Sequence, residues 1–202
     1  MHPDTMRLID RWVGIPLCFF ASFWPLKKAQ ADSNSTLATN IPPPDTIVFI
    51  GIAEIGALVV AYPAIKETRK QHPKSRICFI TAPAGLQTLE LMGFEKEDIF
   101  LLETSSIKSL LKGIVNIRSH FKGGRVSAIV LEPFTRFSTL LSAWIGASKR
   151  IGCYRFLNEG VYLGNILTHR LVYNPHLHMS QTYFALAKAL IEPDSAKPLL
   201  KE

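Results

Sequence analysis

The stretch TIVFIGIAEIGALVVAYPAIKETRKQHP, Thr46–Pro73, has the pattern of a strand, a small-residue turn and an amphipathic helix. Its first residues, Thr46–Ile50, are β-branched or aromatic and carry no charge, which suits a strand covered on both faces. The helical part places Lys and Arg late in its length, where they suit the helix dipole, and Pro73 supplies the stop. This unit predicts an α/β fold built on a parallel sheet.

The turn Gly51–Gly56 between this strand and helix has two interpretations. Its glycines permit close backbone approach or positive φ, and the first N–H groups of the next helix have no partner inside that helix. Such a turn can hold an anion. Many α/β proteins begin with the same unit, however, so the glycine pair alone does not distinguish a ligand-binding turn from scaffold.

The composition is that of a globular protein with an excess of positive charge. Of 202 residues, 48% are hydrophobic and 19% are charged, and the net charge is +7. The length suits one domain with appendages. The charge favours acidic partners, which could be phosphorylated substrates, anionic lipid or nucleic acid. Because no long Lys/Arg run interleaves with aromatic residues, we expect no nucleic-acid partner.

The cysteines and histidines do not indicate a metal site. Cys18, Cys78 and Cys153 are odd in number, widely spaced and set in apolar contexts. This argues against a disulfide framework and a Cys-based metal site, and indicates buried thiols of a cytosolic protein. The three histidines between residues 169 and 178 lack interleaved Cys or Asp at ligand spacing, so we expect them in a solvated loop.

Residues 1–28 are expected to form an apolar helix around the uncharged segment Trp12–Leu26. The segment is shorter than the roughly 20 residues that a spanning helix needs. Three interpretations remain open: a secretory signal, a helix lying on a membrane surface, and a helix packed on the protein's own core. Acidic residues before the segment weigh against the first. Residues 29–45, rich in Ser, Thr, Asn and Pro, are expected to be a tether.

Strand and helix patterns alternate through residues 46–192. After the opening unit we expect strands at 76–81, 99–102, 126–131 and 150–153, and helices at 85–92, 105–121, 137–145 and 179–191. In the helix at 105–121, Leu110, Leu111, Ile114 and Ile117 are expected to face inward. The alternation predicts a Rossmann-like parallel sheet with flanking helices and right-handed crossovers. Residues 193–202 are expected to be a tail or the start of an interdomain linker.

Ligands of such sheets bind beyond the carboxyl ends of the strands, so the loops there should share one rim. A carboxylate at the rim can act as a general base, and arginines can clamp an anion. The charged residues in or near these loops are Glu54, Glu132, Arg136, Lys149, Arg150 and Arg155. The alternatives are solvated acids, helix caps and surface ion pairs.

Five sequence blocks occur in the order found in one enzyme family. They are DRWVGIPLC (Asp10–Cys18), IVFIGIAEIGALVVAYPAI (Ile47–Ile65), VLEPFTRFSTLLS (Val130–Ser142), KRIGCYR (Lys149–Arg155) and YNPHLHMSQTYFALAKAL (Tyr173–Leu190). Together they resemble glycosyltransferase family 9, which contains the ADP-heptose:lipopolysaccharide heptosyltransferases. The resemblance covers nearly all of the chain except the tether, and it corresponds to the amino-terminal half of such enzymes.

The resemblance implies the amino-terminal, acceptor-binding domain of a GT-B fold, in which two Rossmann-like domains face each other across a cleft. The implied activity is transfer of a sugar from a nucleotide-sugar to a lipopolysaccharide-type or other lipid-linked anionic glycan. The donor, an ADP-heptose-like nucleotide-sugar, is expected only with a second domain, supplied by a longer chain or by a separate polypeptide. No other cofactor and no metal are expected. The implied location is cytoplasmic, peripheral to the inner membrane.

The resemblance also bears on the catalytic base. Gly56 matches the glycine of the family's first turn. The next position, where heptosyltransferases have an Asp thought to act as base on the acceptor hydroxyl, is Ala57, and alanine cannot take a proton. Glu54 is the only carboxylate in the turn, so we expect it to substitute as the base.

The acceptor side of the site is implied by the remaining rim residues. Arg136 retains the basic residue that contacts the acidic acceptor in the family, and Gly56, Glu132 and Arg155 are the other acceptor-binding candidates. The family's Arg-Val/Ile-Gly signature is retained as Arg150–Gly152. The alternative function is a non-catalytic, membrane-associated module that binds a glycan or another anion, or a truncated product.

Overall fold

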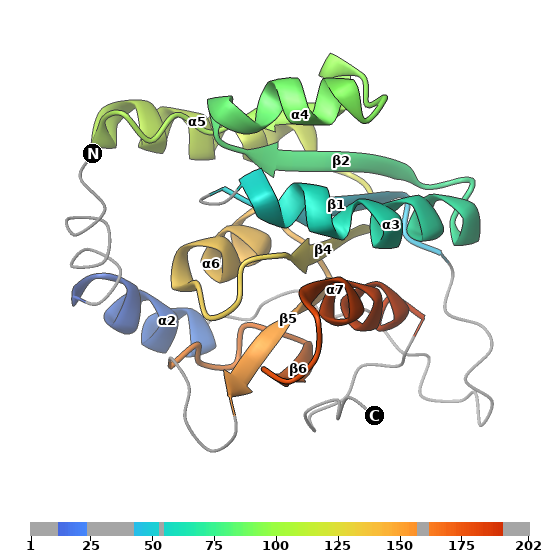
Figure 1. Ribbon diagram of the computed structural model, residues 1–202. Coiled ribbons are helices and arrows are strands. Elements are labelled where there is room, and N and C mark those ends of the chain that lie inside the picture. Colours follow the sequence, from blue (N-terminus) through green and yellow to red (C-terminus); the bar gives the residue numbers. More distant parts are fainter. Residues whose placement is uncertain (1–11, 24–42, 53–54, 157–161, 192–202) are drawn as a thin grey trace.

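The structure is a computed structural model that describes residues 12–23, 43–52, 55–156 and 162–191. Its centre is a six-stranded sheet in the order β3-β2-β1-β4-β5-β6, and all its strand pairs are parallel (Figure 1). The strands are β1 (Thr46–Ile50), β2 (Arg76–Thr81), β3 (Ile99–Leu101), β4 (Val126–Val130), β5 (Lys149–Phe156) and β6 (His169–Tyr173). The predicted Rossmann-like α/β fold is confirmed.

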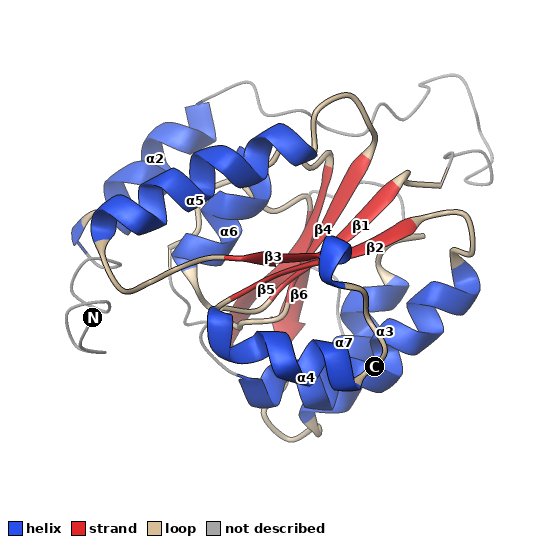
Figure 2. Cartoon of the chain, turned by 90° about the horizontal axis from the view of Figure 1, so that it is seen from above, coloured by secondary structure: helices blue, strands red, loops and turns tan. Residues whose placement is uncertain are grey.

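Helices cover both faces of this sheet (Figure 2). One side carries α3 (Ile55–Gln71), α4 (Leu86–Leu91) and α7 (Met179–Lys188), and the other carries α2 (Gly14–Phe23), α5 (Ile107–His120) and α6 (Arg136–Trp144). Two short 3-10 helices, η1 (Pro83–Gly85) and η2 (Lys96–Asp98), lie in the connections. Because each connection passes over one face, the strands at the centre are buried on both sides.

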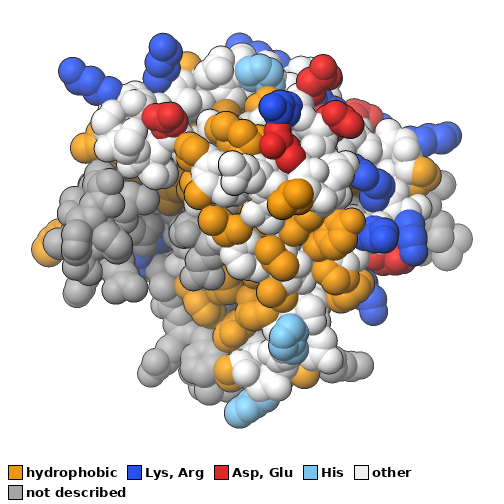
Figure 3. All heavy atoms as spheres, turned by 45° about the horizontal axis from the view of Figure 1, so that its top comes forward, with side chains coloured by type: hydrophobic (Ala, Val, Ile, Leu, Met, Phe, Trp, Pro, Cys, Tyr) orange, Lys and Arg blue, Asp and Glu red, His pale blue; other side chains and the backbone are white. Residues whose placement is uncertain are grey.

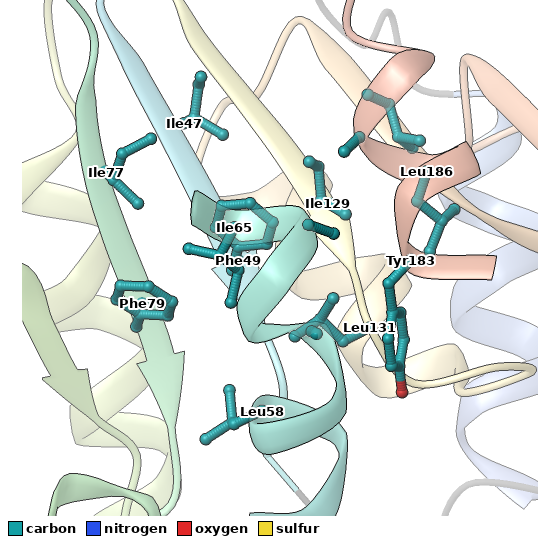
Figure 4. Packing of buried hydrophobic residues seen from close by; sticks show 14 of the residues in the cluster. Ile47, Phe49, Leu58, Ile65, Ile77, Phe79, Ile129, Leu131, Tyr183 and Leu186 are labelled. Atoms are coloured by element: carbon teal, nitrogen blue, oxygen red, sulfur yellow. The ribbon is translucent and has the colours of Figure 1, made fainter. Parts of the chain in front are cut away.

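Alternate residues of the strands supply two separate hydrophobic clusters. Ile47 and Phe49 of β1 face α3, where Phe49 stacks on Phe79 of β2 with ring centroids 5.7 Å apart (Figure 4). Val48 and Ile50 face the other side, toward α5 and α6. The period of two along a strand explains this division. The charge-free sequence of β1 therefore reflects burial on both faces.

All three cysteines are free and buried, as predicted from their apolar contexts. Cys78 lies in β2 within the cluster beneath α5 and α6. Burial raises the pKa of its thiol to about 12, with the nearby Arg76 partly opposing that shift. Because the thiolate is the reactive form, Cys78 is an inert core residue.

Two strands differ from the sequence prediction. β5 extends to Phe156, so Arg155 lies within a strand that pairs with β6 through Val172, and not in a loop after it. β6 itself was not predicted. The expectation of a solvated loop is wrong for His169, which is fully buried in β6 with Nδ1 2.9 Å from the Thr168 hydroxyl. His176 and His178 are exposed, in agreement with the prediction.

The set of α5 residues that face the core differs from the prediction at one position. Ile117 is buried and Leu110 and Ile114 are partly buried against the sheet, as expected. Leu111 was expected to face inward, but its side chain is 57% exposed. A helix has room for only one inward stripe, and the residues at 110, 114 and 117 occupy it.

The N-terminal helix α2 packs on the body of the protein through one side. Cys18 is fully buried, the Ser22 hydroxyl accepts the N–H of Asn165, and α2 contacts α6. Gly164, at φ 59°, allows this approach, because a Cβ there would lie 2.7 Å from the carbonyl oxygen of Cys18. The packing predicted by one interpretation of the segment is therefore present, while the membrane-surface interpretation stays a prediction.

Within the described residues, no helix combines the length and the apolar character needed to cross a membrane. The predicted tether and C-terminal tail fall largely or wholly in residues 24–42 and 192–202, which lie outside the described part of the chain. These assignments stay predictions.

Candidate functional site

The strand order predicts a ligand-binding crevice between β1 and β4. The chain runs outward from β1 to β2 and β3, then returns to place β4 on the opposite side of β1. In open α/β sheets, ligands bind at such a reversal, beyond the carboxyl ends of the strands. At this edge the N–H of Leu131 donates to the carbonyl of Ile50 at 2.9 Å, which keeps the two outgoing loops adjacent.

Glu132 connects the two loops at this crevice. Its Oε1 accepts the backbone N–H of Ile52 at 2.6 Å, and its Oε2 accepts the hydroxyl of Ser138 in the first turn of α6. The residue is only 7% exposed. The interpretation of Glu132 as a solvated loop acid is therefore wrong, and the helix-cap alternative is closer. Its role in acceptor binding stays a prediction.

Arg136 begins α6 and lies at the same rim. Its Nε donates to the carbonyl oxygen of Tyr162 at 3.1 Å, so the guanidinium connects α6 to the segment that follows β5. The side chain is half-buried. A guanidinium presents several donors, and it suits carboxylate and phosphate groups particularly well. The start of α6 adds the positive end of the helix dipole to this position.

Phe134, between these two residues, was not singled out from the sequence. Its φ of 63° is the only positive value for a non-glycine residue in the described part of the chain. Its ring packs edge-on against Tyr173 at the end of β6, with centroids 5.6 Å apart. Bulky residues rarely adopt this backbone conformation, which is costly and tends to occur at functional sites. A phenylalanine carries no sequence signal of positive φ, so pattern analysis could not have found it.

The glycines of the rim have different reasons for being glycine. A Cβ at Gly56 would meet nothing within 4 Å, so this position borders open space. A Cβ at Gly51 would touch Leu58 and Leu131 at ordinary contact distances. At Gly85, in contrast, a Cβ would lie 2.3 Å from the hydroxyl oxygen of Thr81. The sterically required glycine is therefore the one after β2, and neither glycine of the predicted turn has positive φ.

Ala57 is buried in the first turn of α3, with 6% of its surface exposed. It belongs to the cluster that includes Leu58 and Phe49. The position where the family resemblance implies a catalytic Asp thus faces the core in this chain, and no base chemistry can come from it.

The proposed base Glu54 lies outside the described residues, since the chain is described up to Ile52 and again from Ile55. Arg155 is placed in β5, but its side chain is not described. The roles of these two residues stay predictions.

Lys149 and Arg150 do not lie at the rim, because they begin β5 and so occupy the amino edge of the sheet. Lys149 is buried, and its Nζ donates to the carbonyl of Leu190 at 2.9 Å, just beyond α7. Arg150 is 1% exposed, with Nε donating to Ile166 O at 2.6 Å. The predicted association of these two cations with the rim is wrong, because a parallel strand carries its first residues to the opposite edge.

The described rim combines the hydrogen-bonded carboxylate of Glu132, the guanidinium of Arg136 and the N-terminus of α6. This arrangement can bind an anionic group near Arg136, and Glu132 fixes the relative position of the two loops. No group of three or more His, Cys, Asp or Glu side chains is placed to hold a metal in the described ranges.

The fold is that of a Rossmann-like domain whose predicted ligand edge lies at β1 and β4. Among solved structures, the chain is similar to a glycosyl transferase of family 9 from Veillonella parvula, with 16% identity, a TM-score of 0.56, and coverage of 72% of this chain and 41% of that one. It is also similar to the E. coli heptosyltransferase WaaC with ADP-2-deoxy-2-fluoro heptose, with 9% identity, a TM-score of 0.55, and coverage of 75% and 50%.

The WaaC structure with ADP gives a similar result, with 8% identity, a TM-score of 0.53, and coverage of 75% and 49%. At these identities the similarity establishes a shared fold. The chain spans half or less of the length of each structure that it matches. No family model matches the sequence, and no curated protein matches it.

Proposed function

We propose that this chain is the acceptor-binding domain of a heptosyltransferase-like glycosyltransferase. The observation that carries the proposal is the shared fold with a family 9 glycosyltransferase and with a heptosyltransferase over about three quarters of the chain. The five sequence blocks support the same family. The reaction would transfer a sugar from an ADP-heptose-like donor to a lipopolysaccharide-type or other lipid-linked glycan, with the donor held by a second domain or a separate polypeptide.

In this proposal the acceptor binds at the crevice between β1 and β4. Arg136 provides the cation for an anionic group of the acceptor, and Glu132 holds the two loops at a fixed separation through Ile52 and Ser138. Glu54 serves as the base that takes the proton of the acceptor hydroxyl as the new glycosidic bond forms and the bond between the donor's anomeric carbon and ADP breaks, which releases ADP. Arg155 is a further candidate for contact with the acceptor.

The proposed location is the cytoplasmic face of the inner membrane, where a lipid-linked acceptor would be presented. The apolar segment that includes α2, and the net charge of +7, both support attachment to a surface of anionic lipid.

Acceptor binding is tested by titrating a detergent-dispersed, lipid-linked anionic glycan into the wild-type chain, Arg136→Gln and a control, Arg125→Gln. Arg125 is an exposed cation at the amino edge of the sheet, where it pairs with Asp45. Loss of a charge-assisted contact should weaken binding about tenfold in Arg136→Gln. The control should bind like the wild type. Equal affinities in all three proteins, or no binding beyond that of the detergent, would contradict the proposal.

The second candidate function is a non-catalytic module that binds a glycan or another anion. It is favoured by the buried Ala57 at the position where the family resemblance implies the base. An assay of acceptor-dependent ADP release from ADP-heptose, with the donor domain supplied, distinguishes the two functions. Turnover that is lost in Glu54→Gln supports the enzyme. Acceptor binding with no turnover supports the module.

A further inference from the structure

Helix α2 leaves most of its apolar surface uncovered. Gly14 and Cys18 face the body, whereas large side chains point away from it. The most exposed are Leu17, Phe19, Phe20 and Phe23 of the helix, together with Trp12 and Val13 just before it. Phe23 is 74% exposed. Exposed apolar area of this extent on one helix indicates a surface that binds something.

A second exposed apolar stripe lies on α5. Ile107, Leu111 and Val115 follow each other at intervals of four residues, which places them on one side of the helix. Leu111 is 57% exposed and Val115 is 63% exposed. Each of the first two is followed by a lysine, Lys108 or Lys112, so the stripe is bordered by positive charge.

Helix α6 joins these two helices into one layer. It contacts α2, and its Trp144 donates from Nε1 to the carbonyl of Ile114 in α5 at 3.0 Å. The guanidinium of Arg118 lies over the same indole, 4.6 Å from its centroid. All three helices lie on one side of the sheet (Figure 2). The apolar sides of α2 and α5 therefore belong to the same side of the molecule.

The charge of this layer has one sign. The sequences of α2, α5 and α6 contain no Asp or Glu, whereas α5 and α6 carry lysines and arginines. On the other side, α3 and α4 carry Glu67 and Glu90, and Figure 3 shows apolar side chains there bordered by acids and cations alike.

We propose that the outer side of the layer formed by α2, α5 and α6 lies on an anionic lipid bilayer, with the α5 stripe as a second contact beside α2. Aromatic and aliphatic side chains enter the boundary between head groups and acyl chains, and the lysines meet the lipid phosphates. Self-association through the same surface would bring Lys108 and Lys112 of two copies together, which opposes a dimer. The inference deepens the proposed membrane attachment and rests on it, but it does not depend on transferase chemistry.

The orientation that follows would serve the proposed site. α5 and α6 both start at the carboxyl edge of the sheet, since each follows a parallel strand. A bilayer against these helices would therefore border the rim that carries Arg136.

Flotation with lipid vesicles tests the inference. The full chain, Leu111→Gln/Val115→Gln and the control Val59→Gln/Leu91→Gln are mixed with vesicles of phosphatidylcholine, alone or with phosphatidylglycerol. The control positions are 52% and 89% exposed on the opposite side. The wild type and the control should bind the anionic vesicles more tightly than the neutral ones. The α5 variant should lose about tenfold in partition, because two apolar contacts are removed.

The inference would be overturned by an α5 variant that binds like the wild type, by a control that loses as much as the α5 variant, or by equal binding to neutral and anionic vesicles. Circular dichroism checks that the variants are folded, and sedimentation checks their mass. A wild-type dimer that the α5 substitutions dissociate would assign the surface to self-association instead. Because the vesicles contain no acceptor, a failed glycan titration would leave this result unaffected.

Discussion

Buried charge occurs at both edges of the sheet, but with opposite sign. At the amino edge, Lys149 and Arg150 donate to backbone carbonyls. At the carboxyl edge, Glu132 accepts a backbone N–H and a hydroxyl. In a parallel α/β sheet, helices begin at the carboxyl edge with free N–H groups and end at the amino edge with free carbonyls. The sign of each buried charge thus complements the backbone groups that the topology leaves there.

The two edges also differ in what else they carry. At the amino edge, Lys149 and Arg150 donate to backbone carbonyls of the protein itself, so their contribution is to the stability of the fold. The carboxyl edge has, in addition, the positive φ of Phe134, the open space above Gly56 and the half-buried Arg136. A basic residue in the sequence is therefore weak evidence for a ligand site until the edge that it occupies is known.

The largest effect is expected from Arg150→Met at the amino edge. The change keeps a long side chain but leaves the carbonyls of Ala147 and Ile166 without their buried donor. The free energy of unfolding should fall by about 4 kcal/mol, since each unsatisfied buried group costs about 1–3 kcal/mol. Urea denaturation measures it, and Arg125→Met at the surface should change little. A loss no larger than that of the surface variant would disprove the structural role of Arg150.

Ala57→Asp tests whether a buried negative charge at the carboxyl edge is stabilising merely because free helix N–H groups lie there. The position is in the first turn of α3, where the helix dipole favours a carboxylate by up to about 2 kcal/mol. Its side chain, however, faces an apolar cluster, and burying an unpaired carboxylate costs several kcal/mol. We expect a net loss of about 3 kcal/mol in thermal or urea denaturation. A variant as stable as the wild type would show that the new carboxylate reaches solvent.

Glu132→Leu should have an intermediate effect. It leaves the N–H of Ile52 and the hydroxyl of Ser138 without this acceptor, at a cost of about 2 kcal/mol. Glu132→Gln keeps one carbonyl oxygen and should lose about half as much. Urea denaturation of both variants gives the ratio of their losses in the free energy of unfolding. Equal losses would mean that the charge, and not the hydrogen bonds, stabilises the crevice.

The smallest effect concerns His72, just beyond the end of α3 at the amino edge. Burial, and secondly the positive Lys149, lower the pKa of His72 from its ordinary value of 6.5. The unfolded chain then takes up a proton at higher pH than the native protein does. The free energy of unfolding should therefore fall as the pH drops below about 6.5. The fall should stop once the pH has passed the lowered pKa of the native state.

Denaturation at about pH 7.5 and pH 5.5 measures this dependence. His72→Gln should show a smaller difference between the two conditions than the wild type, whereas the exposed His176→Gln should match the wild type. Identical differences in all three proteins would contradict a buried neutral His72.

The sequence predicted the sheet well where the pattern was local. The period-two and helical patterns located β1 to β4 and most helices within one or two residues, because their burial is regular. β6 was missed because His169–Tyr173 combines histidine, arginine and tyrosine, and its burial comes from pairing with β5 and not from composition.

The site was predicted less completely, because it depends on contacts between residues that are far apart in the sequence. Pattern analysis assigned Glu132 and Arg136 to the rim, but it could not show that the Glu132 carboxylate is held by Ile52 and Ser138, which are distant or ordinary residues in the sequence. It also counted Lys149 and Arg150 with the rim, although both stand at the start of the predicted strand 150–153, and the first residues of a parallel strand lie at the opposite edge. Hydrogen bonds across 80 residues of sequence leave no periodic signal.

Gly164 is the position at which α2 can be separated from the rest of the protein. Its missing side chain is what allows α2 to rest on the body, so any larger residue there would meet Cys18 and Ser22 and lift the helix. Gly164→Val would detach the first helix while leaving its own apolar side chains unchanged. An engineer could thus obtain a first helix and a sheet domain that are joined in sequence yet behave as independent parts, and could study each in the presence of the other.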